Sequence, residues 1–287
     1  MSPAPLMRTV PLRDRVQVYA EYGDGLAASP AIVMVHGLRG TWQGLDRVAR
    51  ALCSQYRVII PALPGFGDQP DLTAGNTVAG YVQWLDEFVT ALDIPAVHLF
   101  GHSFGSIIAA ASAGMPLRSL TLMNPVAVSS DRGPHPVLSR FASALYSAAG
   151  IVPHGMGTWL LTNRLHVRGM SVAMVRTHDR ALRRWIHLQH DTYYNSYTSL
   201  PGVIDAFRES AHRSVSDYVG RIRVPTLLIA GDMDDIATVA QERELCLRIP
   251  GARLEVIHGV GHLIHYERPA EAAGIIRRFL SAQDAAQ

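Results

Sequence analysis

The sequence contains no lysine, and all 26 of its basic side chains are arginine. Schiff-base chemistry needs a lysine amine, and a phosphate-binding P-loop needs a lysine after its glycines. The absence of lysine therefore excludes both kinds of site. The formal net charge is only +2, which gives no reason to expect a nucleic acid or an anionic membrane surface as a partner.

Cysteine is nearly absent as well. Cys53 and Cys246 lie far apart and in no C-x-x-C pair, so we expect two free, buried thiols in helices. No window approaches about 18 consecutive apolar residues, so a transmembrane helix is not expected. The N-terminus, residues 1–9, has no long apolar stretch, so no signal peptide is expected. These absences predict a cytoplasmic protein, and whether it forms a homo-oligomer is left open.

Sites for a cofactor or a metal are not evident either. Residues 64–68 include two glycines but lack the G-x-G-x-x-G spacing of a dinucleotide site. His187 and His190 stand one helical turn apart with Asp191 beside them. A third metal ligand is missing, and a solvated helix face is the favoured interpretation. We therefore expect neither cofactor nor metal.

What is present is the pattern of a large folded domain: of 287 residues, 48% are hydrophobic and 17% charged. A hairpin is predicted over 8–22, ended by 23–25. Short apolar runs then alternate with amphipathic stretches. Strands are predicted over 31–35, 56–60, 96–100, 119–123, 226–230 and 253–257, and helices over 41–54, 77–92, 106–113, 239–247 and 269–280. The alternation predicts an α/β fold, a parallel sheet with helices on both faces.

The alternation breaks between residues 126 and 216, where no parallel strand is evident. Helical stretches are predicted near 137–149, 156–165, 170–176, 181–189 and 203–212. The segment is too long to be one loop of a domain. We interpret 126–216 as a helical cap inserted into a core domain that comprises residues 1–125 and 217–287.

The stretch Gly101-His102-Ser103-Phe104-Gly105 joins an apolar run to a helix-tolerant stretch of small residues. A strand, a tight turn and a helix are the context that the G-x-S-x-G motif requires. Such a turn would raise the Ser103 hydroxyl above the sheet, beside the free N–H groups of a helix N-terminus. Taken alone, the motif also fits a glycine-bounded turn with a capping serine.

Four segments leave predicted strands at the carboxyl edge, where open parallel sheets bind ligands. They are residues 36–40, Ser103, residues 232–235 and His262. A serine hydroxyl is a poor nucleophile unless a base lies within hydrogen-bond reach and an anion orients that base. The chain order Ser, Asp, His is the one that this triad takes on this architecture.

Together these motifs resemble the alpha/beta-hydrolase fold superfamily, in its cap-bearing branch. The resemblance rests on His36-Gly37, Pro64-Gly65-Phe66-Gly67, the 101–105 motif, Gly231-x-x-Asp234-x-Ile236, and Gly261-His262 followed by Glu267-Arg268-Pro269. It implies an eight-stranded, mostly parallel sheet with the cap inserted after the sixth strand. It also implies that Ser103 is the nucleophile, Asp234 the acid and His262 the base. The backbone N–H groups of Leu38 and Phe104 would form the oxyanion hole.

Alternatives stay open for two of these roles. Asp232 and Asp235 compete for the role of the acid, and His258 and His265 compete for that of the base. The spacing of the family motif favours Asp234 as the acid. Gly261, directly before His262, favours His262 as the base.

Three further residues near the strand ends are assigned supporting roles. His36 is interpreted as a structural residue whose ring ties down the oxyanion loop at the edge of the substrate site. Ala62 and Gln69 stand where relatives often have Asp and Ser. These two departures bear on loop hydrogen bonding and on substrate rather than on the triad.

The predicted cap is rich in aromatic side chains. A cap over the strand ends must form one wall of any pocket, and Trp159, Trp185 and Tyr194 are the candidates for that wall. Arg39, next to the oxyanion loop, is the candidate for binding a substrate carboxylate. The apolar, aromatic character predicts a small-molecule substrate with a substantial apolar acyl or alcohol part.

The leading hypothesis is a serine hydrolase that cleaves an ester or related acyl bond through an acyl-enzyme. C–C bond hydrolysis, acyl transfer and cyclisation use similar triads in relatives, and fold analogy does not separate them. A binding protein that keeps the fold without turnover is a third alternative, against which the intact triad residues count. The serine at the nucleophile position argues against a haloalkane dehalogenase or an epoxide hydrolase, because relatives with those activities use Asp there.

Overall fold

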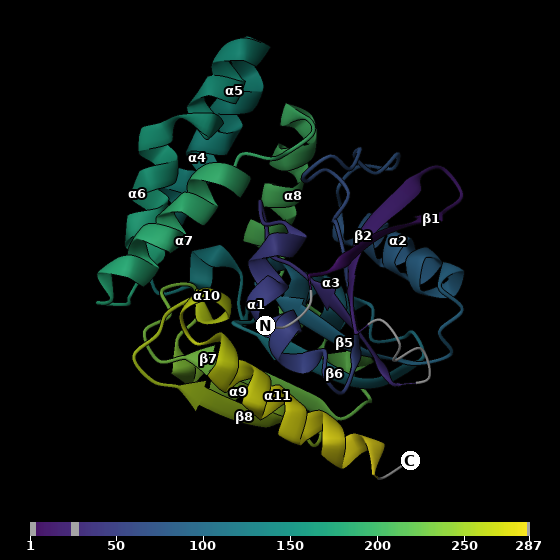
Figure 1. The fold of residues 1–287 in the computed structure, drawn as a ribbon. Coiled ribbons are helices and arrows are strands. Elements are labelled where there is room, and N and C mark those ends of the chain that lie inside the picture. The colour runs from purple at the N-terminus through teal and green to yellow at the C-terminus, as the bar shows by residue number, and fades with distance from the viewer. Residues whose placement is uncertain (1–3, 24–28, 286–287) are drawn as a thin grey trace.

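The computed structural model describes residues 4–23 and 29–285, which form one sheet with helices on both faces (Figure 1). Its strands are β1 (Leu6–Pro11), β2 (Val16–Tyr22), β3 (Ala31–Val35), β4 (Arg57–Pro61), β5 (Val97–His102), β6 (Leu117–Met123), β7 (Thr226–Gly231) and β8 (Arg253–Ile257). Their order is β1-β2-β4-β3-β5-β6-β7-β8. Only the β1–β2 and β2–β4 pairs of these strands are antiparallel. The predicted eight-stranded, mostly parallel sheet is confirmed.

The predicted N-terminal hairpin is formed by β1 and β2, whose strands pair from Leu6 with Glu21 to Pro11 with Val16. The end of this hairpin was expected at residues 23–25. Residues 24 and 25 lie outside the described residues.

Two hydrophobic clusters cover the two faces of the sheet. Successive residues of a strand point to opposite faces. In β3, Ile32 and Met34 belong to one cluster, whereas Val33 and Val35 belong to the other. All four are buried because helices cover this central strand on both sides. The first face packs against α1 (Asp46–Leu52) and α11 (Pro269–Asp284), and the second against α2 (Val78–Ala91), α3 (Phe104–Ala111) and α9 (Val239–Arg248).

Five helices lie between β6 and β7 in the chain: α4 (Pro136–Ile151), α5 (His154–Thr162), α6 (Arg164–Met174), α7 (Arg180–Tyr193) and α8 (Leu200–His212). We call residues 126–216 the helical segment. Figure 1 shows these helices gathered at one end of the molecule, away from the C-terminal end of α11.

Helix boundaries in the helical segment differ most from the prediction around α5 and α6. The stretch predicted at 156–165 is interrupted at Asn163, whose backbone is not helical. The Asn163 side chain instead accepts a hydrogen bond from the Leu165 N–H at 2.8 Å and so begins α6. The stretch predicted at 170–176 is the end of α6 rather than a separate helix.

The helix predicted over 41–54 also divides, into a short 3-10 helix η1 (Trp42–Leu45) and α1. Thr41 precedes η1 but its side chain makes no capping hydrogen bond. The remaining short elements are η2 (Ser130–Arg132), η3 (Val215–Asp217), η4 (Val219–Arg221) and α10 (Ile264–Glu267). Among the described residues, no helix combines the length and apolarity needed to cross a bilayer.

The two cysteines are free, as predicted. Cys53 is buried and follows the last residue of α1, whereas Cys246 lies in α9 and is partly exposed. The prediction of a second fully buried thiol is therefore wrong.

Candidate active site

Ser103 lies at the turn between β5 and α3, in a backbone conformation that few non-glycine residues adopt. Its φ is 54°, in the left-handed region. The glycines on both sides are needed for close packing. A Cβ on Gly101 would lie 2.3 Å from the Gly105 carbonyl oxygen, and a Cβ on Gly105 would lie 2.3 Å from the Val35 carbonyl oxygen. The turn therefore holds Ser103 at the carboxyl end of β5 above the sheet.

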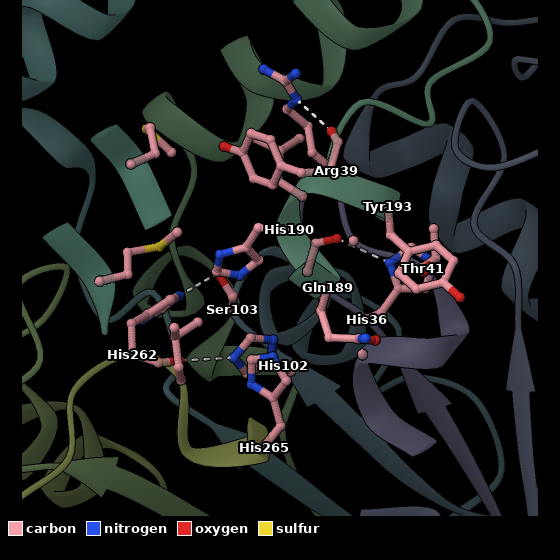
Figure 2. Close-up of a pocket in the computed structure, with 18 of the residues that line it drawn as sticks. His36, Arg39, Thr41, His102, Ser103, Gln189, His190, Tyr193, His262 and His265 are labelled. Atoms are coloured by element: carbon pink, nitrogen blue, oxygen red, sulfur yellow. Dashed lines mark hydrogen bonds between the residues drawn. The ribbon is translucent and has the colours of Figure 1, made fainter. Parts of the chain in front are cut away.

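Two residues that follow later strands form a hydrogen-bonded line with Ser103. His262, after β8, has its Nε2 at 2.8 Å from the Ser103 Oγ. Its Nδ1 lies 2.9 Å from Oδ2 of Asp234, which follows β7. If Nδ1–H donates to Asp234, Nε2 is free to accept the proton of the serine hydroxyl. This is the geometry that a serine nucleophile, a general base and an orienting anion require; Figure 2 shows the first two of these groups, Ser103 and His262.

The Asp234 carboxylate is buried but well supplied with donors. Asn124 Nδ2 donates to Oδ2 at 2.8 Å, and the Ile236 N–H donates to Oδ1 at 2.8 Å. Burial alone would raise the pKa of Asp234, but neighbouring His262 and these donors outweigh it and hold the pKa below its usual value. Asp234 is therefore an anion at neutral pH.

Sequence reasoning missed the part that Asn124 plays in this site. In the structure, Asn124 Nδ2 bonds both Asp234 and the Gly261 carbonyl oxygen, at 2.8 and 3.2 Å. Its positive φ of 45° gives no sequence signal beyond the tolerance of Asn for that conformation.

The competing carboxylates have other partners. Asp232 accepts from the Gly259 N–H at 2.8 Å and pairs with the exposed His258 at 2.9 Å. Asp235 pairs with Arg176 on the exposed surface. Neither carboxylate bonds the histidine that faces Ser103, so the geometry favours Asp234 as the acid.

Two backbone N–H groups next to Ser103 fit an oxyanion. Phe104 is the first residue of α3, and the N–H groups of a first helical turn have no partner within the helix. Leu38 lies in the turn closed by the Gly40 N–H and the Gly37 carbonyl oxygen at 3.0 Å. This turn lies against the serine, because a Cβ on Gly37 would be 3.1 Å from the Ser103 Cβ.

His36 holds this turn in place. Its Nδ1 lies 3.0 Å from the Gly37 carbonyl oxygen, and its Nε2 accepts from the Leu63 N–H at 3.2 Å. Burial lowers the pKa of His36 to about 4, so the ring is neutral at pH 7. His36 lines the cavity, but both of its ring nitrogens are engaged by the protein. Its structural interpretation fits this geometry, and a direct contact with substrate through either nitrogen does not.

The structure corrects the prediction for Arg39. Four of the five guanidinium N–H donors are taken by protein acceptors: the Tyr194 and Leu161 carbonyl oxygens, the Tyr146 hydroxyl and the Asn195 Oδ1, at 2.8 to 3.1 Å. The side chain is only 1% exposed. Arg39 therefore ties the loop after β3 to the helical segment instead of offering its fork to a substrate carboxylate.

The three aromatic candidates for the pocket wall have different positions. Tyr194 is partly buried, lines the cavity and stacks under Arg39, whose Cζ lies 4.3 Å from the ring centroid. Trp185 packs edge-on against Tyr266 instead and does not line the cavity. Trp159 is 60% exposed on α5 and also does not line it. Of the three, only Tyr194 lies where the sequence predicted, because the other two face away on their helices.

A cavity of about 260 Å³ lies between the strand ends and the helical segment. Ser103 and His262 line it together with apolar side chains from both parts, namely Leu38, Leu45, Ala142, Met170, Met174, Phe207, Ile236 and Leu263. Histidines also line it. His102 directs its Nε2 to the His262 carbonyl oxygen at 3.2 Å, and burial lowers its pKa to about 3. The cavity therefore places a neutral, mainly apolar space beside the Ser103 hydroxyl.

The interpretation of His187 and His190 as a solvated face is wrong for His190. The Nδ1 atoms of both histidines lie within 2.7 Å of the Ser171 Oγ. His190 is buried and lines the cavity. No group of three or more His, Cys, Asp or Glu side chains in the described ranges has the arrangement of a metal site.

The family model of the alpha/beta hydrolase family matches residues 32–275. The chain belongs to this family. It is 27% identical over 259 residues to the pimeloyl-[acyl-carrier protein] methyl ester esterase of Aeromonas hydrophila, covering 88% of this chain and 95% of that relative. It is 26% identical over 266 residues to 3-oxoadipate enol-lactonase 1 of Acinetobacter baylyi, covering 90% and 91%. This member of the alpha/beta hydrolases is thus a hydrolase enzyme.

The fold of this alpha/beta hydrolase is also that of solved structures. An esterase from Exiguobacterium antarcticum superimposes with a TM-score of 0.77 at 18% identity, covering 96% of this chain and 100% of that structure. At this identity the likeness concerns the fold alone.

Proposed function

We propose that this hydrolase cleaves carboxylic esters of small, largely apolar molecules with Ser103 as its nucleophile. The single observation that carries the proposal is the line Asp234–His262–Ser103, with contacts of 2.9 and 2.8 Å, at the wall of the cavity. In this proposal the helical segment serves as a cap over the strand ends. A cytoplasmic location stays a prediction, and whether the protein forms a homo-oligomer stays open.

The proposed reaction has two halves. Ser103 Oγ attacks the ester carbonyl carbon while His262 Nε2 takes the hydroxyl proton. The carbonyl oxygen becomes negative and accepts hydrogen bonds from the Leu38 and Phe104 N–H groups. His262 then gives its proton to the departing alkoxide, which leaves as the alcohol. A water molecule, deprotonated by His262 in turn, hydrolyses the acyl-enzyme, while Asp234 stays ionised throughout.

The character of the cavity supports an uncharged substrate. Its walls are mainly apolar, and the guanidinium of Arg39 is already engaged by four protein acceptors. A carboxylate in the cavity would lose its hydration and could not form a two-pronged pair with Arg39, whose donors are already engaged. The activities for which two relatives are named, a methyl ester esterase and an enol-lactonase, both concern an ester bond and support the choice of reaction.

The test uses a fluorophosphonate probe and p-nitrophenyl esters of short, straight-chain acids. We expect the probe to label the wild type, and Ser103→Ala to abolish both labelling and ester hydrolysis. Ser139→Ala, which removes an exposed hydroxyl on α4, is the matched control and should keep both. Labelling that persists in Ser103→Ala would contradict the proposed nucleophile.

A further inference from the structure

One side of the cavity has polar atoms that the proposed reaction does not use. Thr41 lines the cavity, and its Oγ1 has no hydrogen-bond partner among the described residues, although the residue is only 7% exposed. A threonine in front of a helical turn usually caps it with this oxygen. Thr41 does not cap η1, so its hydroxyl is available to something else.

His265, on α10, is the second such group. It also lines the cavity, it is 6% exposed, and its Nδ1 has no partner within the described ranges. Its ring is held by contacts at centroid distances of 4.2 Å to His102 and 4.1 Å to Tyr266. A buried polar atom that lacks a partner is unfavourable, so two of them on one cavity call for a ligand or a water to complete them.

Thr41 and His265 belong to the same stretch of wall. Gly44 connects them: its N–H donates to the Thr41 carbonyl oxygen at 3.0 Å. A Cβ on Gly44 would lie 3.4 Å from the Tyr266 hydroxyl oxygen and 4.0 Å from His265 Cδ2. In Figure 2, Thr41 lies on the side of Ser103 that is away from His262. A group bound there would belong to the part of the substrate that does not react.

The charge of this wall selects the kind of group. Arg39 is the only permanently charged side chain among the described residues that line the cavity, and its donors are engaged. Burial, together with neighbouring His102, His262 and His190, holds the pKa of His265 well below its usual value, so its ring is neutral. The neutral imidazole nitrogen of His265 and the hydroxyl of Thr41 suit a neutral group that can both donate and accept a hydrogen bond. A hydroxyl on the substrate is such a group.

We propose that Thr41 and His265 form a subsite for a hydroxyl group on the non-reacting part of the substrate, so that the enzyme prefers hydroxylated esters. This inference rests on the proposed ester hydrolysis. A site that has polar groups to satisfy discriminates against a ligand that leaves them unpaired. One neutral hydrogen bond contributes about tenfold in kcat/KM, which is the preference we expect for a correctly placed hydroxyl.

The experiment compares esters that differ by one hydroxyl. The acyl-side pairs are p-nitrophenyl butyrate with its 2-hydroxy and 3-hydroxy forms, and the alcohol-side pair is propyl butyrate with 2-hydroxypropyl butyrate. The ratio of kcat/KM within each pair is measured for the wild type and for Thr41→Val. Dividing one ratio by the other cancels the intrinsic reactivity of each ester.

We expect Thr41→Val to lower the ratio about tenfold in at least one pair. Thr41→Ser, which keeps the hydroxyl, should restore the ratio. Thr192→Val, which removes an exposed hydroxyl on α7, is the matched control and should leave the ratio at its wild-type value. His265→Phe, which keeps an aromatic ring and removes both nitrogens, should lower the same ratio in the same pair.

Two outcomes separate this inference from the function on which it rests. If the wild type hydrolyses the plain esters and no ratio changes in Thr41→Val or His265→Phe, the subsite is overturned and the esterase proposal stands. If no ester of either kind is hydrolysed and the fluorophosphonate probe does not react, the proposed function itself has failed.

Discussion

The cavity has two walls that differ in what holds their residues in place. The strand wall is formed by the segments that follow β3, β5, β7 and β8, and the helical wall by the helical segment. On the strand wall, Asp234 and His262 are buried in the loops that follow β7 and β8, and they form a line with Ser103 through bonds of 2.9 and 2.8 Å. On the helical wall, many apolar side chains point to solvent instead of the core. Val137, Leu138, Phe141, Trp159 and Leu165 are all at least 60% exposed.

This difference has a simple physical source. β5 and β7 pair with neighbours on both edges, and β8, at the end of the sheet, pairs with β7, so backbone hydrogen bonds fix the point at which each chain leaves the sheet. A helix in an outer layer packs along one stripe, and which of its side chains reach the cavity depends on its rotation. The chemistry is therefore placed on the wall whose geometry is rigidly determined, and the shape of the cavity is completed by the other.

The sharpest way to test the strand wall is to remove the charge of its acid. Asp234→Asn keeps the shape but stabilises the wrong tautomer of His262, so we expect kcat for ester hydrolysis to fall about 10⁴-fold. Asp232→Asn is the matched control. Asp232 pairs with His258 away from Ser103, so this variant should change kcat less than about twofold. Steady-state kinetics on one ester gives kcat for both variants. Equal losses of kcat would contradict the assignment of Asp234 as the acid.

The strand wall is also the part that sequence reasoning predicts well. Ser103, Asp234 and His262 are recognisable because motifs fix their spacing from strands, and parallel strands bring such residues to one edge. Asn124 was missed because its amide reaches Asp234 across 110 positions of sequence, with no local pattern to announce it. The six strands that follow the N-terminal hairpin were predicted from apolar runs, whereas the eight-stranded sheet was implied by the family resemblance.

The helical wall is where sequence reasoning fails. The helices themselves are predictable from periodicity, but the side chains that face the cavity are not. Trp159 and Tyr194 are both aromatic residues of this segment, yet only Tyr194 lines the cavity. Thr41 fits the pattern of a helix cap and does not act as one. In each case tertiary packing determines what the side chain contacts, and the local sequence pattern does not contain that information.

The junction between the two walls can be broken at Arg39. Arg39→Met leaves four acceptors without their donor, including the buried carbonyl of Leu161, and should lower the free energy of unfolding by about 3 kcal/mol. Because Arg39 adjoins Leu38, kcat/KM should fall too. Urea denaturation measures the stability, and Arg208→Met, an exposed arginine on α8, should stay within about 0.5 kcal/mol of the wild type. Equal stability of the two variants would mean that Arg39 does not join the walls.

Acidification tests whether the two walls unfold together. Burial lowers the pKa of His36, on the strand wall, to about 4. Burial, with His187 beside it, also lowers that of His190, on the helical wall, to about 4. Between pH 6.5 and 4 the unfolded chain binds more protons at these sites, so the unfolding free energy falls as pH falls. Each site contributes a slope of about 1.4 kcal/mol per pH unit.

Replacing either histidine should therefore remove part of that slope. His36→Gln and His190→Gln are compared by urea denaturation at several pH values between 4.5 and 6.5. If the walls unfold as one unit, each variant loses about 1.4 kcal/mol per pH unit of the slope. His154→Gln, at an exposed position on α5, is the control that keeps it. A change in slope with His36→Gln alone would mean that the helical segment unfolds separately.

The smallest expected effect concerns Trp159 and Tyr194, two aromatic residues of the helical segment. Trp159→Ala removes a side chain that is 60% exposed and does not line the cavity, so stability should change by less than about 0.5 kcal/mol and kcat/KM by less than about twofold. Tyr194→Ala removes a partly buried ring that stacks under Arg39 and should cost about 2 kcal/mol in stability. Thermal and urea unfolding measure both. A large loss of kcat/KM with Trp159→Ala would show that α5 is rotated about its axis so that the indole faces the substrate. The contrast between a rigidly placed strand wall and a loosely placed helical wall would then not hold.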